Sequence, residues 1–407
     1  MYLTIEAKHL RSALPAVQAI ASAEKIALPI LKHLLLLADA SSVVLGVSNE
    51  EISLRYRLPA TVQAPGSALV PAHFFAGFVH DLPQVPLTLL VPSPTDATAA
   101  QIRCARVNAH MKLGALPIEE FPAMPIYPES GRHLLTINCE LLREAISQVA
   151  FAAASHSEHP VLEGVRMAFE HGQASFAAAD AFRLYVRRLT FPDQQLCAEV
   201  ILSARTLRTL ARLLPSSGSV SIALASTGNQ MLFHVNTLDA SALDVAIRLI
   251  AGTFPTYGSF LTAQPSTRVV APTHALAEAV RLCAPFAREN AHRLHLHVRP
   301  QHPDEAAALV LEAQAPDLGA NEIRLDESIT VEGAELTLVV NDTYLADALA
   351  VVQAREVALE FSGATHPLAM KPVDPLDHVS IIMPQVLRNT PAAVAQKSAS
   401  VARAARA

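Results

Sequence analysis

The feature that most constrains the fold of this chain is a threefold internal repetition. Three similar segments begin at Tyr2 (YLTIEAKHLRSALPAVQAIA), Leu134 (LLTINCELLREAISQVAFAA) and Arg268 (RVVAPTHALAEAVRLCAPFA). Each joins a short alternating run to an apolar pattern of helical period, which predicts a strand, a turn and an amphipathic helix. Because self-similarity of this kind indicates tandem copies of one unit, three similar domains are expected.

A second strand and helix follow at a matching place in each repeat. They begin at Leu69 (LVPAHFFAGFVHDLP), Ile201 (ILSARTLRTLARLLP) and Val339 (VVNDTYLADALAVV). Ser203, and either Asn341 or Asp342, precede helical patterns and are predicted N-caps, since their side chains can accept from free backbone N–H groups. The common order of these landmarks supports the division into repeats.

The predicted fold class is α+β. Alternating stretches such as QASFAAADAFRLYVRRL, bounded by Gly, Ser, Pro and Asp, lie between the helices and predict antiparallel strands. Each repeat would hold two helices and antiparallel sheets around its own core. The predicted domains cover residues 1–129, 130–263 and 264–388, followed by a flexible tail over 389–407. From Arg388 the text has four basic residues and no acidic one, which is typical of a solvated appendage.

Composition excludes several classes of protein. With 407 residues, 51% hydrophobic and 17% charged, the chain is long and apolar enough to fold compactly. A net charge of -6 argues against wrapping nucleic acid by bulk charge, but permits a local basic surface. Four widely spaced cysteines suggest neither a disulfide framework nor a zinc ribbon. Such cysteine usage fits a reducing cytoplasm, where the protein is expected. No apolar run reaches the roughly 18 residues of a membrane span, so insertion into a membrane is not expected.

Basic residues gather on one face of several predicted helices. Arg205, Arg208 and Arg212 fall within about 80° of one another at 100° per residue, and Lys8 with Arg11 repeat the arrangement in the first helix. In the helix that carries Arg205, the opposite face is apolar and holds Leu207, Leu210 and Leu214. The third repeat offers two further arginines, Arg281 and Arg288. A single stripe is typical of a solvated face, but its recurrence favours one shared cationic surface.

The sequence carries none of the common catalytic signatures, such as G-x-S-x-G, a phosphate-binding loop or H-E-x-x-H. His292, His295 and His297 could place two imidazoles on one face of a strand as a metal pair. Without an acidic or cysteine ligand at suitable spacing, ordinary exposed strand histidines are favoured. His156 and His159 are expected in a surface loop. Asp180 is expected to be a turn or capping residue, rather than a catalytic carboxylate.

Eight short strings carry a resemblance to a known family. They are LPIL (28–31), VPA (70–72), LPIEEFP (116–122), HPVLEGV (159–165), ADAFRL (179–184), RLIAGTFPTY (248–257), NDTYLADAL (341–349) and IIMPQVL (381–387). In this order and spacing they resemble the beta subunit of bacterial DNA polymerase III, the sliding clamp, over residues 1–387.

The resemblance implies a head-to-tail homodimeric ring of six domains, with helices lining a central hole and sheets outside. Such a ring would encircle double-stranded DNA without reading its sequence and would not be an enzyme. No cofactor and no metal are implied. The implied partners are the DNA polymerase III alpha subunit, the clamp loader and other proteins with clamp-binding motifs, with no membrane partner.

The resemblance also implies site residues. A partner-peptide pocket would include Leu162, Arg183, Leu184, Pro255, Asn341, Tyr344, Pro367, Ile382, Met383 and Pro384. Without the resemblance, Leu162, Leu184 and Ile382 would be interpreted as core strand residues. Lys25 and His156 would contact DNA, together with the basic helix residues Lys8, Arg11, Arg205, Arg208 and Arg212. The dimer joint would place His110 and Met111 against Pro285 and Phe286 of the partner, in a seam with few opposed charges.

The chain departs from the family pattern around the pocket. Ala179 and Ala181 replace a hydroxyl residue and a glycine, and Gln385 replaces an apolar residue. His159 and Ser259 stand where arginine is common. These departures put the peptide preference in doubt. Two alternatives remain open at this point: a monomeric peptide-binding scaffold, and a hydrolase or transferase whose site uses His156, His159 and Asp180.

Overall fold

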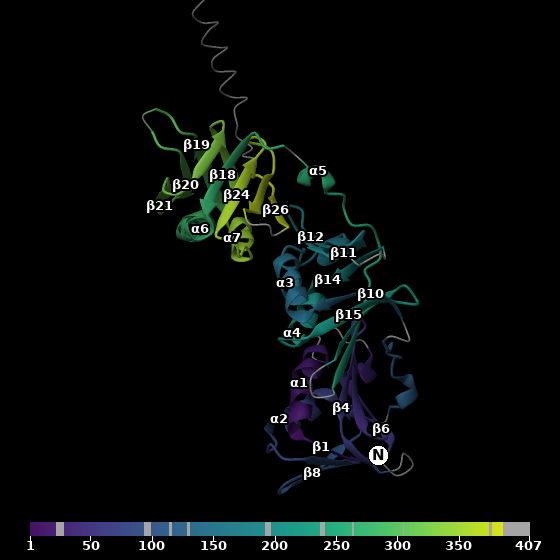
Figure 1. Ribbon diagram of the computed structural model, residues 1–407. Helices are drawn as coiled ribbons and strands as arrows, with labels where there is room; N and C mark the ends of the chain where they lie inside the picture. Colours follow the sequence, from purple (N-terminus) through teal and green to yellow (C-terminus); the bar gives the residue numbers. More distant parts are fainter. Residues whose placement is uncertain are drawn as a thin grey trace, which may run out of the picture. The chain divides into compact units, whose positions relative to one another are not determined.

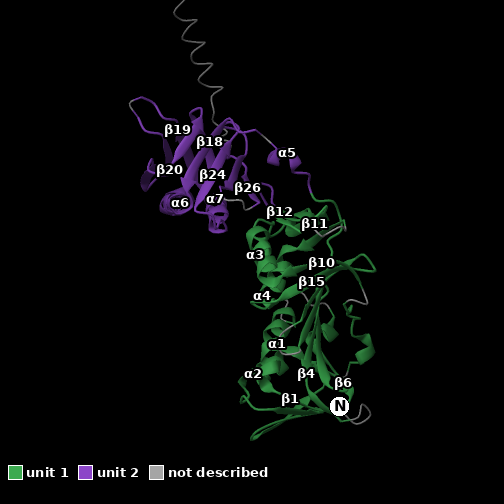
Figure 2. Cartoon of the chain, viewed as in Figure 1, with its two compact units in different colours: residues 1–178, 188–254 green, residues 179–187, 255–407 purple. Residues whose placement is uncertain are grey.

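The computed structural model describes residues 1–21, 28–92, 99–113, 116–127, 131–191, 197–236, 241–262, 264–303, 305–373 and 377–385 (Figure 1). Two compact units divide the chain, residues 1–178 with 188–254 and residues 179–187 with 255–407 (Figure 2). The first unit therefore holds the first two repeats, and the second holds the third repeat with a short piece of the second. Within the described residues no helix is long and apolar enough to cross a membrane.

Paired helices recur in each repeat, as the periodicity predicts. Figure 2 shows the four helices of the first unit along one side of it. They are α1 (Ala7–Ala21), α2 (Ala72–Asp81), α3 (Cys139–Ala150) and α4 (Ala204–Leu213). The second unit has the corresponding pair and one short helix: α6 (Thr273–Arg288), α7 (Asp342–Ala350) and α5 (Gly258–Leu261). Three short 3₁₀ helices lie in the first unit: η1 (Pro29–Lys32), η2 (Ile118–Glu120) and η3 (Pro160–Glu163).

One antiparallel sheet joins the first two repeats. Its eight strands run in the order β10-β15-β16-β17-β4-β3-β2-β6. Their bounds are β2 (His33–Ala38), β3 (Ser42–Ser48), β4 (Ile52–Pro59), β6 (Gly66–Pro71), β10 (Gly131–Asn138), β15 (Ser219–Ala225), β16 (Gln230–Asn236) and β17 (Ala242–Arg248). The junction is the pairing of β17 with β4, from Ala242 opposite Arg57 to Ile247 opposite Ile52. Backbone hydrogen bonds therefore hold the two repeats edge to edge.

The first unit contains further strands. A five-stranded sheet has the order β5-β1-β7-β8-β9, and β11 pairs with β12 and β14. Their bounds are β1 (Tyr2–Ile5), β5 (Thr61–Ala64), β7 (Leu87–Leu90), β8 (Ala99–Cys104), β9 (Val107–Lys112), β11 (Gly164–Glu170), β12 (Gln173–Ala179) and β14 (Ala198–Ser203). Strand β9 lies at an edge of its sheet.

The second unit has two sheets, in the orders β13-β26-β25-β24-β18-β22 and β21-β20-β19-β23. Their bounds are β13 (Arg183–Thr190), β18 (Thr267–Pro272), β19 (Arg293–Arg299), β20 (Ala308–Ala315), β21 (Gly319–Leu325), β22 (Thr330–Gly333), β23 (Leu336–Asn341), β24 (Glu356–Phe361), β25 (Leu368–Pro372) and β26 (His378–Ile382). The start of β13 comes from the second repeat, yet it pairs with β26, from Arg183 opposite Ile382 to Arg187 opposite His378. A strand of one repeat thus completes the sheet of the next.

The helix caps follow from the side chains present. Ser203 Oγ accepts from the backbone N–H of Thr206 at 3.4 Å, which confirms it as the N-cap of α4. Asn341 Oδ1 accepts from Thr343 N at 2.9 Å, so Asn341 is the cap of α7. Asp342 is the first residue of that helix instead, and its carboxylate lies in the negative-charge-favouring first turn.

Candidate functional site

Helix α4 separates a basic face from an apolar one. Arg205, Arg208 and Arg212 are exposed, whereas Leu207 and Leu210 are fully buried. This is the division predicted from the 3.6-residue period. A helix of this kind can present positive charge to a polyanion while its other face holds it on the sheet.

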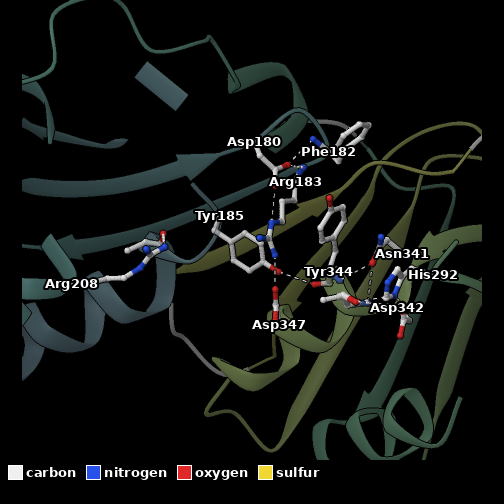
Figure 3. Close-up of polar contacts among 12 residues, drawn as sticks. Asp180, Phe182, Arg183, Tyr185, Arg208, His292, Asn341, Asp342, Tyr344 and Asp347 are labelled. Carbon is white, nitrogen blue, oxygen red and sulfur yellow. Dashed lines mark hydrogen bonds and ion pairs between the residues drawn. The ribbon is translucent and has the colours of Figure 1, made fainter. Parts of the chain in front are cut away.

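Two of these arginines also bond to backbone. Arg208 Nη2 donates to the carbonyl of Ala150, the last residue of α3, at 2.6 Å, and Figure 3 shows this side chain. Arg212 Nε donates to the carbonyl of Arg208 at 3.3 Å. These bonds restrict the side chains without removing their charge, since a guanidinium has five donors.

Arg11 differs from the expectation of an open basic face. It is half-buried, and its Nη2 donates to the carbonyl of His80 at 2.8 Å and to that of Leu82. Those carbonyls lie at the end of α2, where backbone acceptors lack helical partners. The guanidinium of Arg11 therefore caps α2, while Lys8 is exposed, and the DNA contacts of both residues stay predictions.

The second repeat contains the same device. Arg143, the fifth residue of α3 as Arg11 is of α1, donates through Nε to the carbonyl of Ala211 at 3.2 Å and through Nη2 to that of Leu214 at 2.7 Å. In the third repeat the fifth residue of the first helix is Ala277, which lines an open cavity of about 850 Å³. The cap is therefore shared by two of the three repeats.

The loop residues have separate local roles. His156 is exposed, and Lys25 lies outside the described residues. His159 is also exposed, and its backbone N–H donates to Ser157 Oγ at 3.0 Å. Asp180 Oδ1 accepts from the N–H of Phe182 at 2.7 Å, which confirms Asp180 as a turn residue. This use of Asp180 lends no support to the alternative of a hydrolase or transferase.

His292, His295 and His297 are half-buried, rather than exposed as expected. The rings of His295 and His297 lie 6.1 Å apart on one face of β19. His297 Nε2 lies 3.1 Å from Glu312 Oε2, and its Nδ1 lies 2.9 Å from Thr337 Oγ1. Burial lowers the pKa of His295. The described part of the chain contains no group of three His, Cys, Asp or Glu placed to hold a metal ion.

An ion-pair cluster occupies the second unit. Figure 3 shows Arg183 between two carboxylates, with Nε 3.0 Å from Asp180 Oδ2 and Nη1 2.6 Å from Asp347 Oδ2. The guanidinium also lies 4.6 Å from the centre of the Tyr344 ring, a cation–π distance. Tyr185 donates its hydroxyl to the carbonyl of Tyr344 at 3.1 Å, and burial raises the pKa of Tyr185. Arg183 thus contacts two carboxylates and the Tyr344 ring, and its part in binding a peptide stays a prediction.

A pocket of about 380 Å³ lies beside this cluster, and we call it the Tyr344 pocket. Its lining is Phe182, Ala291, Arg293, Asn341, Tyr344, Met383, Pro384 and Gln385. Phe182 is 58% exposed and stacks on Tyr344 with ring centres 6.5 Å apart, and Met383 is 36% exposed. A concave surface with exposed apolar side chains and a few polar groups is typical of a binding site.

A second pocket of about 230 Å³, which we call the Phe260 pocket, lies in the same unit. Its lining is Ser259, Phe260, Pro265, Glu360, Ser362, His366, Pro367, Ala369, Lys371 and Ile381. It contains one of the expected residues, Pro367, and an apolar side chain, Phe260, that is 42% exposed. Lys371 and Glu360 form an ion pair of 2.6 Å within the lining.

The expected pocket residues therefore divide into groups. Asn341, Tyr344, Met383 and Pro384 meet in the Tyr344 pocket. Two others, Leu184 and Ile382, are buried in paired strands, as expected of residues that belong to the core of a sheet. Leu162 is half-buried in the first unit, and Pro255 is exposed in the second.

Sequence reasoning did not select Phe182, Arg293 or Phe260. Phe182 lies inside the recognised string ADAFRL, and could have been found from it. The sequence around Arg293 and Phe260 does not mark them as site residues, because residues distant in the sequence complete both pockets.

The residues expected at the dimer joint differ in exposure. His110 and Pro285 are exposed and Phe286 is half-buried, whereas Met111 is 4% exposed and belongs to the core. We correct the assignment of Met111, since successive residues of β9 point to opposite faces. Other large apolar side chains are exposed: Phe74 at 61%, Leu282 at 50% and Leu318 at 74%.

Three tandem domains, each with two helices and antiparallel sheets, define the class of DNA clamps. Three family models of the DNA polymerase III beta subunit match most of the chain: the N-terminal domain over residues 1–125, the central domain over 136–256 and the C-terminal domain over 259–386. The chain belongs to the family of DNA polymerase III beta subunits.

Named relatives agree with this family. The beta sliding clamp of Streptomyces coelicolor is 29% identical over 342 residues, with 83% of this chain and 85% of that one covered. That of Bacillus subtilis is 26% identical over 379 residues, covering 89% and 94%. The fold is similar to the crystal structures of the Bacillus subtilis clamp (TM-score 0.85, 23% identity, 95% and 99% covered) and the Pseudomonas aeruginosa beta subunit (TM-score 0.83, 23% identity, 95% and 100% covered).

Proposed function

We propose that this chain is a sliding clamp: two copies close into a ring that encircles duplex DNA and tethers the replicative polymerase. Non-specific binding to DNA has dissociation constants of roughly 10⁻⁴ to 10⁻⁶ M, too weak to retain a polymerase through long synthesis. A closed ring is retained by topology instead, so a modest basic inner face suffices in a chain of net charge -6. The single observation that carries the proposal is the exposed basic face of α4 within a three-domain clamp fold.

The proposed DNA contacts are electrostatic. Lys8, Arg205, Arg208 and Arg212 are exposed on helices and would meet phosphates without reading bases. By the resemblance, Lys25 and His156 would add contacts from loops. Arg11 would contact DNA as well, while its guanidinium holds the end of α2.

The proposed partner site is the pair of pockets in the second unit. Short peptides of the DNA polymerase III alpha subunit, the clamp loader and other clamp-binding proteins would insert apolar side chains beside Tyr344, Met383 and Phe260. Partner binding there supplies the tether, and no catalytic step is required of this chain.

The proposed ring is a homodimer of domains spanning residues 1–129, 130–263 and 264–388. Edge strand β9 of one protomer would lie against edge strand β21 of its partner, because an unpaired edge is a template for another strand. His110 would face the partner's Pro285 and the partner's Phe286. Exposed Leu282 and Leu318 favour a seam that is mainly apolar.

The experiment that tests this function compares closed circular DNA with linearised DNA. Once loaded by a clamp loader, the full-length protein should stay on the circle in high salt, and should be lost when the circle is cut. Sedimentation should give a dimer. A monomer, or equal loss from both DNAs, would instead favour a monomeric peptide-binding scaffold.

A further inference from the structure

Arg293 lines the Tyr344 pocket, and none of the described carboxylates forms an ion pair with it. Arg293 is the first residue of β19, where pairing with Asn341 of β23 holds it at the pocket. Its side chain is half-buried, and its Nη1 reaches Asn290 Oδ1 at only 3.5 Å, a long hydrogen bond. Among the residues that the structure describes, no acidic group forms an ion pair with Arg293.

The carboxylates drawn in Figure 3 have other partners. Asp180 and Asp347 bind Arg183, at 3.0 Å and 2.6 Å. Asp342 Oδ1 lies 2.8 Å from His292 Nδ1, and its side chain is almost fully buried. None of these three carboxylates lines the pocket, and Arg293 is the one charged side chain among the described residues of its lining.

The surroundings of Arg293 would strengthen a bond between its guanidinium and a carboxylate. Phe182, Tyr344 and Met383 line the same pocket as Arg293, and the side chain of Arg293 is half-buried. A planar guanidinium presents paired N–H donors that match the two oxygens of a carboxylate. In a partly desolvated site such a bond is stronger than on an open surface.

We infer that Arg293 makes the Tyr344 pocket selective for partner peptides that carry an aspartate or glutamate next to their apolar anchor. The apolar side chain would pack on Phe182, Tyr344 and Met383, and the carboxylate would pair with Arg293. This inference rests on the proposed function, since it presumes that the pocket binds peptides. It adds the chemistry of the sequence that the pocket prefers.

Selection from a random phage-displayed peptide library on immobilised full-length protein tests the inference. Wild-type protein should enrich peptides with Asp or Glu beside an apolar residue, and Arg293→Gln should lose that acidic preference. A synthetic amidated peptide of the enriched sequence should bind about tenfold or more tightly than its Asp→Asn version, since a charged hydrogen bond contributes roughly 1.5–3 kcal/mol. With Arg293→Gln the two peptides should bind equally. The four affinities form a double-mutant cycle that measures the interaction between Arg293 and the aspartate of the peptide.

The matched control is Arg299→Gln, because Arg299 ends the same strand, is exposed and lies outside the pocket lining. It should keep the acidic preference. Enriched peptides without acidic residues, or an acidic preference that survives in Arg293→Gln, would overturn the inference alone. A gain in affinity only when the peptide has a free C-terminal carboxylate would also overturn it. If Tyr344→Ala and Met383→Ala change no peptide binding, the proposed pocket itself fails.

Discussion

At the scale of single residues, burial changes chemistry at His378. This side chain is 4% exposed in β26, and its Nε2 lies 3.3 Å from Ser380 Oγ. Burial, and then the positive charge of Arg187, lower its pKa to about 4, against a smaller raising effect of Asp377. His378 is therefore neutral in the folded protein at neutral pH.

The lowered pKa predicts a loss of stability in mild acid. Unfolded protein takes up the proton near the ordinary pKa of about 6.5, whereas folded protein resists it until about pH 4. As the pH decreases from about 6.5 to about 4, the free energy of unfolding should therefore decrease, by up to about 1.4 kcal/mol per pH unit from this group. Urea titrations of wild type and His378→Gln measure it. The variant should show a shallower slope, and identical slopes would contradict the assignment.

Several residue roles could be predicted from the sequence and others could not. Ser203 and Asp180 act on backbone groups a few positions away, so local sequence predicts them. His110 and Met111 were both expected at a joint, although strand alternation puts neighbours on opposite faces. Arg293 reaches the Tyr344 pocket through a pairing with Asn341 that no local pattern encodes.

At the scale of elements, an arginine from the first helix stabilises the end of the second. Arg143→Ala would remove the donors to the carbonyls of Ala211 and Leu214, leaving half-buried acceptors at the C-terminus of α4. The expected loss is roughly 1.5–3 kcal/mol of unfolding free energy, because these bonds involve a charged donor. Urea denaturation measures it, and Arg11→Ala should act in the same direction in the first repeat.

The matched control for this prediction is Arg212→Ala, which removes an exposed arginine from α4 itself. It should change stability by no more than about 0.5 kcal/mol. Equal stability of Arg143→Ala and wild type would show that solvent caps these carbonyls as well as the guanidinium does.

The periodicity of the sequence predicts the helices themselves, but it does not predict this cap. The arginine donor and its two carbonyl acceptors are 68 and 71 positions apart in the sequence.

At the scale of the whole molecule, sheet edges decide how repeats connect. The pairing of β17 with β4 makes one sheet of two repeats, and β13 adds to the sheet of the third. Repetition in the sequence predicts the number of domains, but edge pairing depends on register between distant strands. Strands β9 and β21 remain as edges within the protomer, and the proposed dimer would pair them.

The apolar character of the proposed seam predicts a dimer that resists salt. Leu282 is 50% exposed on α6, and its carbonyl accepts from Asn321 Nδ2 of β21 at 2.8 Å, so it flanks that edge. Salt screens charge pairs and leaves apolar contacts in place. Sedimentation equilibrium should therefore give a similar dimer dissociation constant at low and high salt. Leu282→Asp should yield monomers, because dimerisation would bury an unpaired charge.

Phe182→Asp is the control for that change, because Phe182 is a comparably exposed apolar residue that lies in the Tyr344 pocket instead. It should leave the dimer intact and weaken peptide binding. A dimer that separates in salt would mean that opposed charges, and not apolar side chains, hold the joint. A Leu282→Asp protein that stays dimeric would place the seam on another surface, and the ring would then need a different closure.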